Sequence, residues 1–195
     1  MTANKKSEEN EFDGVGLVKE ERFHYQKPFS LEGGELEELE LVYETYGELN
    51  DNGTNCVLVC HALTGDHHAA GYHTDKSEKP GWWHHLIGPD KPIDTNLFFV
   101  VCSNCLGACS GSTGPATHHP QFPEKTYGMT FPDFTIADMI LAQKLLLEFL
   151  QVQCIEVVIG GSMGGMQALQ WIVDYPNYVK KSLVIAATPR HSAQT

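Results

Sequence analysis

The stretch Ile155-Glu156-Val157-Val158-Ile159-Gly160-Gly161-Ser162-Met163-Gly164 decides the fold. Its first five residues form an apolar run of the kind found in parallel strands that are buried on both faces. The residues that follow, Gly165 to Val173, have the pattern of a helix. A strand, the motif G-x-S-x-G and a helix in this order predict a nucleophile elbow, a sharp turn that holds a serine hydroxyl above the edge of a sheet.

The glycines of this motif have a steric reason. Only glycine lets a strand and the following helix approach closely enough for the turn, which leaves the backbone of Ser162 strained. The amide of Met163 would then point at the reacting carbonyl, and the helix beginning there would direct its positive end the same way. A glycine-rich turn with an incidental serine is the alternative, and the flanking strand and helix favour the elbow.

Composition excludes several classes of function. The chain has 195 residues and a formal net charge of −12, which argues against binding to nucleic acid or to an anionic membrane. Its apolar runs are too short to span a bilayer. Residues 1–20 are acidic and lack periodicity, so we expect a disordered tail without a signal peptide, followed by one domain over residues 21–195.

Two groups of residues resemble metal ligands in their spacing. Cys102, Cys105 and Cys109 run from an apolar strand into a Gly/Ser loop, which suits reduced cysteines better than a metal site. The segment 66–95 is rich in histidine and aromatic residues. Adjacent histidines point opposite ways on a strand, and no helical ligand spacing occurs, so we expect no metal here either. The histidines concerned are His67, His68, His73, His84 and His85.

The residues before the elbow predict further strands. Two runs joined by a glycine turn suggest an antiparallel hairpin: Phe23 to Leu31, with a break at Pro28, and Leu39 to Gly47. The continuous apolar run from Cys56 suits a central parallel strand, and Leu63 lies in the loop where it ends. Ligands bind at that edge of open α/β sheets.

The order of the remaining elements completes the fold. Asn96 to Asn104 predicts a buried strand, Phe131 to Leu150 a helix with a Thr135 capping box, and Lys181 to Thr188 a sixth strand. Alternating strands and helices predict an α/β fold with a mostly parallel sheet and helices on both faces. This is the order of an α/β-hydrolase up to its sixth strand, an architecture in which the loop at Leu63 donates a second oxyanion amide.

Three segments together resemble one family. They are His61-Ala62-Leu63-Thr64-Gly65, the Gly/Ser loop from Asn104 to Pro115, and Gly160 to Gln167. They resemble the homoserine O-acetyltransferase family of methionine biosynthesis, and Thr188 to Ala193 is similar to it as well. The resemblance runs from about residue 20 to the end of the chain.

The resemblance implies an activity and a site. It implies transfer of an acetyl group from the co-substrate acetyl-CoA to the γ-hydroxyl of L-homoserine, by a ping-pong route through an acyl-serine. Ser162 would be the nucleophile, and the amides of Leu63 and Met163 would bind the oxyanion. The family implies a cytoplasmic protein, usually a homodimer, that needs no metal. We also expect no permanently bound cofactor and, from the charge and the short apolar runs, no nucleic-acid or membrane partner.

One departure from the family concerns the general base. The family's Asp and His lie beyond the sixth strand, and neither His61 nor His191 is a credible substitute. We therefore expect the chain to be the N-terminal part of a longer enzyme, truncated after its sixth strand and inactive alone.

Several alternatives stay open at this point. The acyl donor could be succinyl-CoA, and the acceptor could be serine. A plain serine esterase would share the elbow but pass the acyl group to water. A non-catalytic remnant is the remaining possibility.

Overall fold

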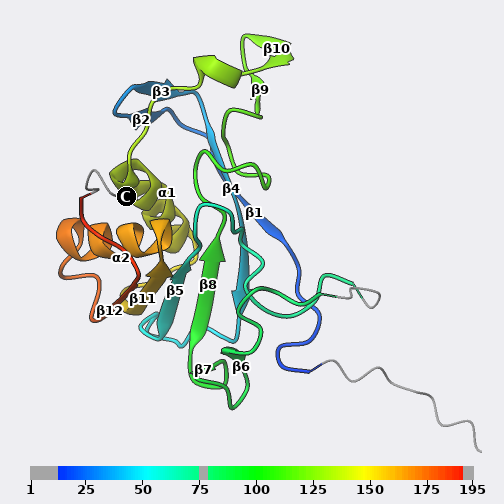
Figure 1. Cartoon of the computed structure of the whole chain (residues 1–195), viewed down its shortest axis with the longest axis vertical. Helices are drawn as coiled ribbons and strands as arrows, with labels where there is room; N and C mark the ends of the chain where they lie inside the picture. Colours follow the sequence, from blue (N-terminus) through cyan, green and yellow to red (C-terminus); the bar gives the residue numbers. More distant parts are fainter. Residues whose placement is uncertain (1–12, 75–78, 191–195) are drawn as a thin grey trace, which may run out of the picture.

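A six-stranded sheet forms the body of the protein (Figure 1). The computed structural model describes residues 13–74 and 79–190. Across the sheet the strands follow the order β1 (Glu21–Tyr25), β4 (Leu39–Tyr46), β8 (Phe99–Ser103), β5 (Cys56–Cys60), β11 (Ile155–Gly161) and β12 (Ser182–Ile185).

The sheet begins with antiparallel strands and is otherwise parallel, as predicted. β1 and β4 are antiparallel to each other, and β4 is antiparallel to β8. β8, β5, β11 and β12 are all parallel. The antiparallel start, the central place of β5 and the pairing of the sixth strand with the elbow strand are therefore confirmed. The residues of β5 and β8 are buried throughout, because both strands have neighbours on two sides and cover on two faces.

Among the described residues, three small two-stranded sheets lie outside the main sheet. The break expected at Pro28 is confirmed, and the residues after it form a separate strand that pairs outside the main sheet. The other two small sheets were not predicted, because their strands are too short to show a periodic pattern. The pairs are β2 (Phe29–Leu31) with β3 (Gly34–Leu36), β6 (Ile87–Gly88) with β7 (Ile93–Asp94), and β9 (His118–His119) with β10 (Phe122–Thr126).

Two α-helices and a short 3-10 helix, η1 (Gly128–Thr130), are described. α1 spans Ile136–Phe149 and α2 spans Met163–Asp174. The expected helix start at Phe131 is wrong, since Thr135 is the extended N-cap residue, and the carboxylate of Asp138 accepts its backbone N–H at 2.7 Å. α2 ends before Pro176, as expected.

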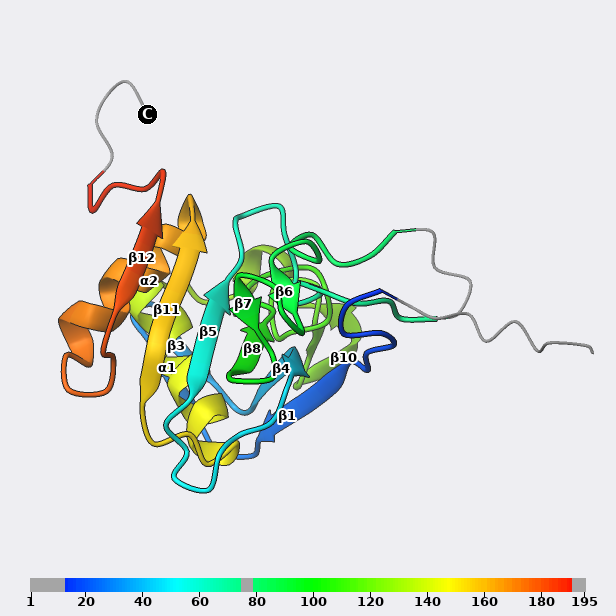
Figure 2. The same ribbon diagram turned by 90° about the horizontal axis from the view of Figure 1, so that it is seen from below.

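Both described α-helices cover the same face of the sheet (Figures 1 and 2). Ile140 and Leu147 of α1 and Trp171 of α2 join one core with strand residues such as Leu58. The opposite face of the sheet includes the side chain of Val57, and this face packs against the insertion at residues 66–95. The expectation of helices on both faces therefore fails for the part described, because the insertion takes the place of a helix.

Residues 13–20 lie against the body of the protein. The amide of Val18 donates to the carbonyl of Tyr72 at 2.9 Å, and Leu17 forms a bridge with Tyr72. The rest of the tail expected over residues 1–20 lies outside the described residues. Within residues 13–74 and 79–190, no helix has the length and apolar character needed to cross a membrane.

Candidate active site

Ser162 sits in the turn between β11 and α2, at the carboxyl edge of the parallel strands (Figure 2). Its φ of 55° and ψ of −122° lie in a region that residues other than glycine rarely adopt. The strain predicted for the elbow is therefore present, and the residue is exposed. The turn therefore leaves Ser162 exposed at this edge of the sheet.

Close backbone contacts hold the turn in this strained form. A Cβ on Gly160 would lie 2.2 Å from the carbonyl oxygen of Gly164, so neither strand nor helix leaves room for a side chain. On the other side of the turn, the Ser162 amide donates to the carbonyl of Ile185 in β12 at 3.0 Å. The turn is therefore held between the first residues of α2 and the end of β12.

Two backbone amides near the elbow have no hydrogen-bond acceptor among the residues that the structure describes. Met163 is the first residue of α2, and the amides of the first turn of a helix have no acceptor within it. Leu63 is 75% exposed, and within residues 13–74 and 79–190 its amide has no hydrogen-bond acceptor. The loop of Leu63 directly follows β5, whose end touches the first turn of α2 at Gly164. The assignment of Leu63 and Met163 as oxyanion donors stays a prediction that fits this placement.

His61 holds the loop of Leu63 in place. The residue is 1% exposed, its Nδ1 lies 2.8 Å from the Ala62 carbonyl oxygen, and its Nε2 accepts the Cys105 amide at 3.0 Å. Since a carbonyl only accepts, Nδ1 carries the proton. Burial lowers the pKa of His61, which favours this neutral form. Both ring nitrogens are occupied, so His61 is a positioning residue and not a base for Ser162.

A buried network of side-chain hydrogen bonds connects α2, the helix that follows Ser162, with α1. Gln143 of α1 donates through Nε2 to Oε1 of Gln167 in α2 at 2.8 Å, and Gln143 Oε1 accepts the Trp171 indole N–H at 2.8 Å. The Cys105 thiol lies 3.5 Å from Gln167 Oε1. These contacts link α1, α2 and the Gly/Ser loop. The sequence did not reveal this network, because its members are far apart along the chain.

No general base is found among the residues described. Within residues 13–74 and 79–190, no side chain makes a hydrogen bond to the Ser162 hydroxyl. His191, which the sequence excluded as a base, lies outside the described residues. The described residues therefore form the strained turn at Ser162, and they assign no proton acceptor to it.

The two groups with ligand-like spacing behave differently in the structure. Cys102 and Cys105 are buried and Cys109 is exposed, and among the described residues these cysteines do not gather as metal ligands. The histidines of the insertion lie in a loop, not on a strand, so the argument from opposite side-chain directions does not apply to them. His67 and His73 both face Glu44 of β4, a residue that the sequence did not single out.

Comparison with known proteins places the chain in a family. Residues 55–194 match the model of the α/β hydrolase fold family. The chain belongs to the α/β hydrolase family, in agreement with its sheet and its elbow.

Curated relatives narrow the comparison to acyltransferases. The chain is 55% identical over 183 residues to a homoserine O-succinyltransferase of Halorhodospira halophila, covering 93% of this chain and 48% of the relative. It is also 55% identical over 181 residues to a homoserine O-acetyltransferase of Methanobrevibacter ruminantium, covering 92% and 36%. These homologues are homoserine O-acyltransferases, and the chain spans about half their length or less.

Solved structures agree with this grouping. The crystal structure of homoserine O-acetyltransferase from Bacillus anthracis superposes with a TM-score of 0.86 at 36% identity, covering 91% of this chain and 48% of that one. An esterase superposes with a TM-score of 0.85 at 35% identity, covering 92% and 50%. The fold is therefore shared by enzymes with different acyl acceptors.

Proposed function

We propose that this chain carries the nucleophile of a homoserine O-acyltransferase that moves an acetyl group from acetyl-CoA to the γ-hydroxyl of L-homoserine. The observation that carries the proposal is Ser162, exposed on a strained strand-to-helix turn in a chain that is 55% identical to acyltransferases of homoserine. This chain supplies the side chain of Ser162 and two backbone amides to the proposed site, and we propose no permanently bound cofactor for it.

The chemistry follows from this arrangement in two steps. In the first, Ser162 Oγ attacks the thioester carbonyl, the C–S bond breaks, and CoA leaves as the thiol with the serine proton. In the second, the homoserine hydroxyl attacks the acyl-serine, the ester bond to Ser162 breaks, and its Oγ regains a proton. The amides of Leu63 and Met163 hold the negative oxygen of each tetrahedral intermediate, where the positive end of α2 adds to the attraction.

The proton acceptor is the part that this chain does not supply in our proposal. A serine hydroxyl is a weak nucleophile at neutral pH without a base. We therefore expect the 195 residues alone to be inactive, and the active protein to have an Asp and a His from a further segment. We also propose that the active protein is a cytoplasmic homodimer, as the family resemblance implies.

The nucleophile is tested by mass spectrometry of the acyl-enzyme. Residues 21–195 replace the matching part of the Halorhodospira halophila relative, which supplies the remaining half of the enzyme. Mixing with acyl-CoA in the absence of homoserine should add one acyl group, and Ser162→Ala should abolish the adduct. Ser30→Ala, a change at an exposed serine in β2, serves as the matched control. An adduct that persists on Ser162→Ala refutes the assignment.

The acyl donor has a second candidate. Relatives named as succinyltransferase and as acetyltransferase are equally identical to this chain, so succinyl-CoA is a specific alternative to acetyl-CoA. The reading frame extended downstream of codon 195 would be assayed for CoA release with each donor, and with homoserine, serine or water as acceptor. Release that needs homoserine supports the transferase, whereas equal release with water alone supports the esterase that the solved structure suggests.

A further inference from the structure

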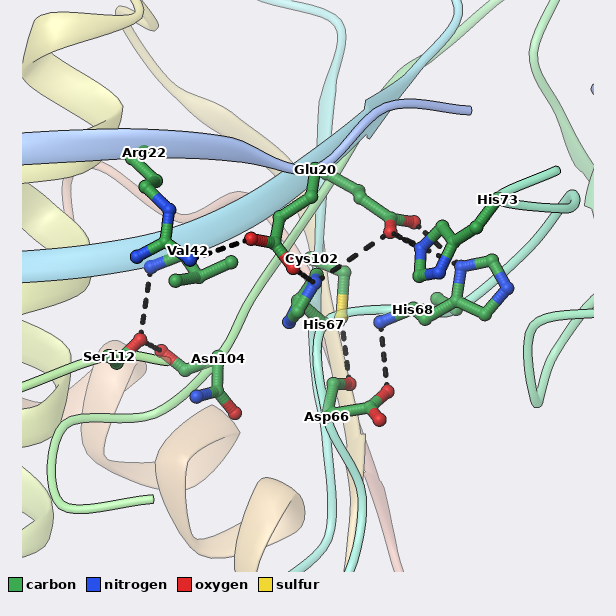
Figure 3. Close-up of polar contacts among 12 residues, drawn as sticks. Glu20, Arg22, Val42, Asp66, His67, His68, His73, Cys102, Asn104 and Ser112 are labelled. Atoms are coloured by element: carbon green, nitrogen blue, oxygen red, sulfur yellow. Dashed lines mark hydrogen bonds and ion pairs between the residues drawn. The ribbon is translucent and has the colours of Figure 1, made fainter. Parts of the chain in front are cut away.

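A cluster of one glutamate and three histidines lies between β4 and the insertion, away from the elbow (Figure 3). Glu44 comes from β4, opposite Cys102 of β8. His67, His68 and His73 come from the loop after β5, and Figure 3 shows these three side chains gathered in one place. The cluster is independent of the proposed acyl-transfer chemistry.

The carboxylate of Glu44 is completely buried and is surrounded mainly by imidazoles. Its Oε1 lies 2.5 Å from His73 Nε2 and 3.8 Å from His67 Nε2, and its Oε2 lies 3.0 Å from His68 Nδ1. Oε2 also accepts the Tyr46 hydroxyl at 2.6 Å. Burial raises the pKa of Glu44, but the hydrogen bonds from His68, Tyr46 and His73 outweigh it and lower the pKa overall. The carboxylate is therefore ionised and needs positive charge nearby.

His67 provides the second observation, because its ring is buried and lacks a hydrogen-bond partner in the described part of the chain. The residue is 4% exposed, and neither ring nitrogen makes a hydrogen bond to any residue of 13–74 or 79–190. Nε2 points toward the carboxylates of Glu20 and Glu44, at 3.3 and 3.8 Å. An unpaired polar atom in such a place costs free energy unless something else binds it.

We propose that Glu44 Oε1, His67 Nε2 and His73 Nε2 bind a divalent transition metal ion of the zinc class. These donor atoms lie within 4.8 Å of one another. Two imidazoles and one carboxylate are ligands that zinc favours, at bond lengths of about 2.0–2.2 Å, which places ligand atoms roughly 3.3 Å apart in a tetrahedron. Small side-chain rotations bring the three atoms to that spacing. Glu20 lies beside the fourth position, next to His67.

His68 takes a different part in this site. Its Nδ1 contacts the carboxylate of Glu44, and its ring lies 3.8 Å from that of His73, centre to centre. A hydrogen bond of this kind orients a ligating carboxylate and tunes its basicity. The ion would therefore tie the insertion to β4, only a few residues after the loop of Leu63, and would stabilise the insertion without touching Ser162.

The proposal runs against the expectation that the histidine-rich segment holds no metal. That expectation depended on the spacing of ligands that are close together in the sequence. This ligand set has no such local spacing, because Glu44 belongs to a strand more than twenty residues earlier in the chain. The rival explanation is that His68 and His73 are protonated and neutralise Glu44 as ion pairs. The two explanations differ in stoichiometry, since ion pairs bind no zinc.

The test measures zinc binding by the 195-residue chain after removal of any tag and treatment with a chelator. Competition with a coloured chelator should give about one zinc per chain, and cobalt should give the visible absorption of a tetrahedral site. His73→Gln and Glu44→Gln should each weaken binding by at least about tenfold. The His73 side chain is 42% exposed, so that variant should keep its fold, which circular dichroism checks.

His85→Gln is the matched control, because His85 is exposed in the same insertion and lies outside the cluster. Its zinc affinity should equal that of the parent chain. The proposal is overturned if the folded parent binds no zinc above trace. It is also overturned if His73→Gln and Glu44→Gln bind zinc as tightly as the parent, which would indicate adventitious binding at surface histidines.

Discussion

A methyl group on Gly164 would lie 2.0 Å from the carbonyl oxygen of Cys60, at the end of the neighbouring strand β5. The obstacle is backbone, which cannot rotate away as a side chain could. Gly164→Ala should therefore destabilise the protein by about 1–3 kcal/mol and displace the first turn of α2. Urea unfolding monitored by circular dichroism would measure the change.

Gly161 provides a matched control within the same turn. A Cβ there would meet its nearest atom, the Ile185 carbonyl oxygen, at 3.9 Å, an ordinary contact. Gly161→Ala should change the free energy of unfolding by no more than about 1 kcal/mol. If both variants lose the same free energy of unfolding, the close approach to Cys60 is not the reason that position 164 requires glycine.

The buried hydrogen-bond network between α1 and α2 predicts a second change in the free energy of unfolding. Gln143→Leu keeps roughly the same volume but leaves the Trp171 indole N–H without its acceptor, and Gln167 Oε1 keeps only the contact with the Cys105 thiol. Each buried group left unpaired costs about 1–3 kcal/mol. Gln170→Ala, which removes only a bond to Asp174 at the helix surface, should cost at most about 0.5 kcal/mol. Similar midpoints of urea unfolding for both variants would argue against the network.

Buried histidines predict a loss of stability in mild acid. Burial lowers the pKa of His61, His67 and His84 from the ordinary value of 6.5. Below that value the unfolded chain takes up more protons than the folded one, so the free energy of unfolding falls as the pH decreases. The lowered pKa of Glu44 adds a further loss as the pH falls below 4.5, its ordinary value, toward its folded pKa.

The measurement is urea unfolding from about pH 8 to about pH 5 with a chelator present, so that metal release does not contribute. His61→Gln can keep a donor and an acceptor at this place but cannot titrate, so the slope below pH 6.5 should decrease. His85→Gln, at an exposed position, should leave the slope unchanged. A parent protein with flat stability over this range would contradict the burial argument.

The fold was largely predictable because its signals are local. The apolar runs of β5, β8 and β11 and the glycine motif at Ser162 report directly on burial and on turn geometry. The boundaries of elements were predicted less well, since the helix expected from Phe131 begins only at Ile136, after its N-cap residue Thr135. The placement of α1 and α2 on one face of the sheet depends on which segment covers the opposite face. The periodic pattern of apolar residues does not show which segment that is.

The site was predictable only where it is contiguous in sequence. Ser162, Met163 and the loop of Leu63 each follow a recognisable strand. Contacts between distant segments were not visible, such as Gln143 with Gln167, or Glu44 with His67. The local argument about neighbouring histidines also assumed a strand, whereas the chain there forms a loop held by tertiary contacts.

The last prediction concerns β12, which pairs with β11 on one side only. Within residues 13–74 and 79–190, no strand pairs with its other edge. Leu183 and Ile185 are 52% and 46% exposed, and Val173 of the adjacent helix α2 is 70% exposed. An unpaired, apolar edge strand without charges is a template for association with another chain. The 195-residue chain should therefore self-associate, which size-exclusion chromatography with light scattering would detect.

Charge on this strand should reverse the association. Leu183→Lys should shift the chain toward a monomer, because lysine on an edge strand opposes pairing with a second copy. Leu97→Lys is the matched control, since Leu97 is 63% exposed but lies in the turn before β8, away from β12. It should leave the association unchanged. If the parent chain is a monodisperse monomer, β12 does not mediate self-association. If the two lysine substitutions have equal effects, added charge controls association and its position does not.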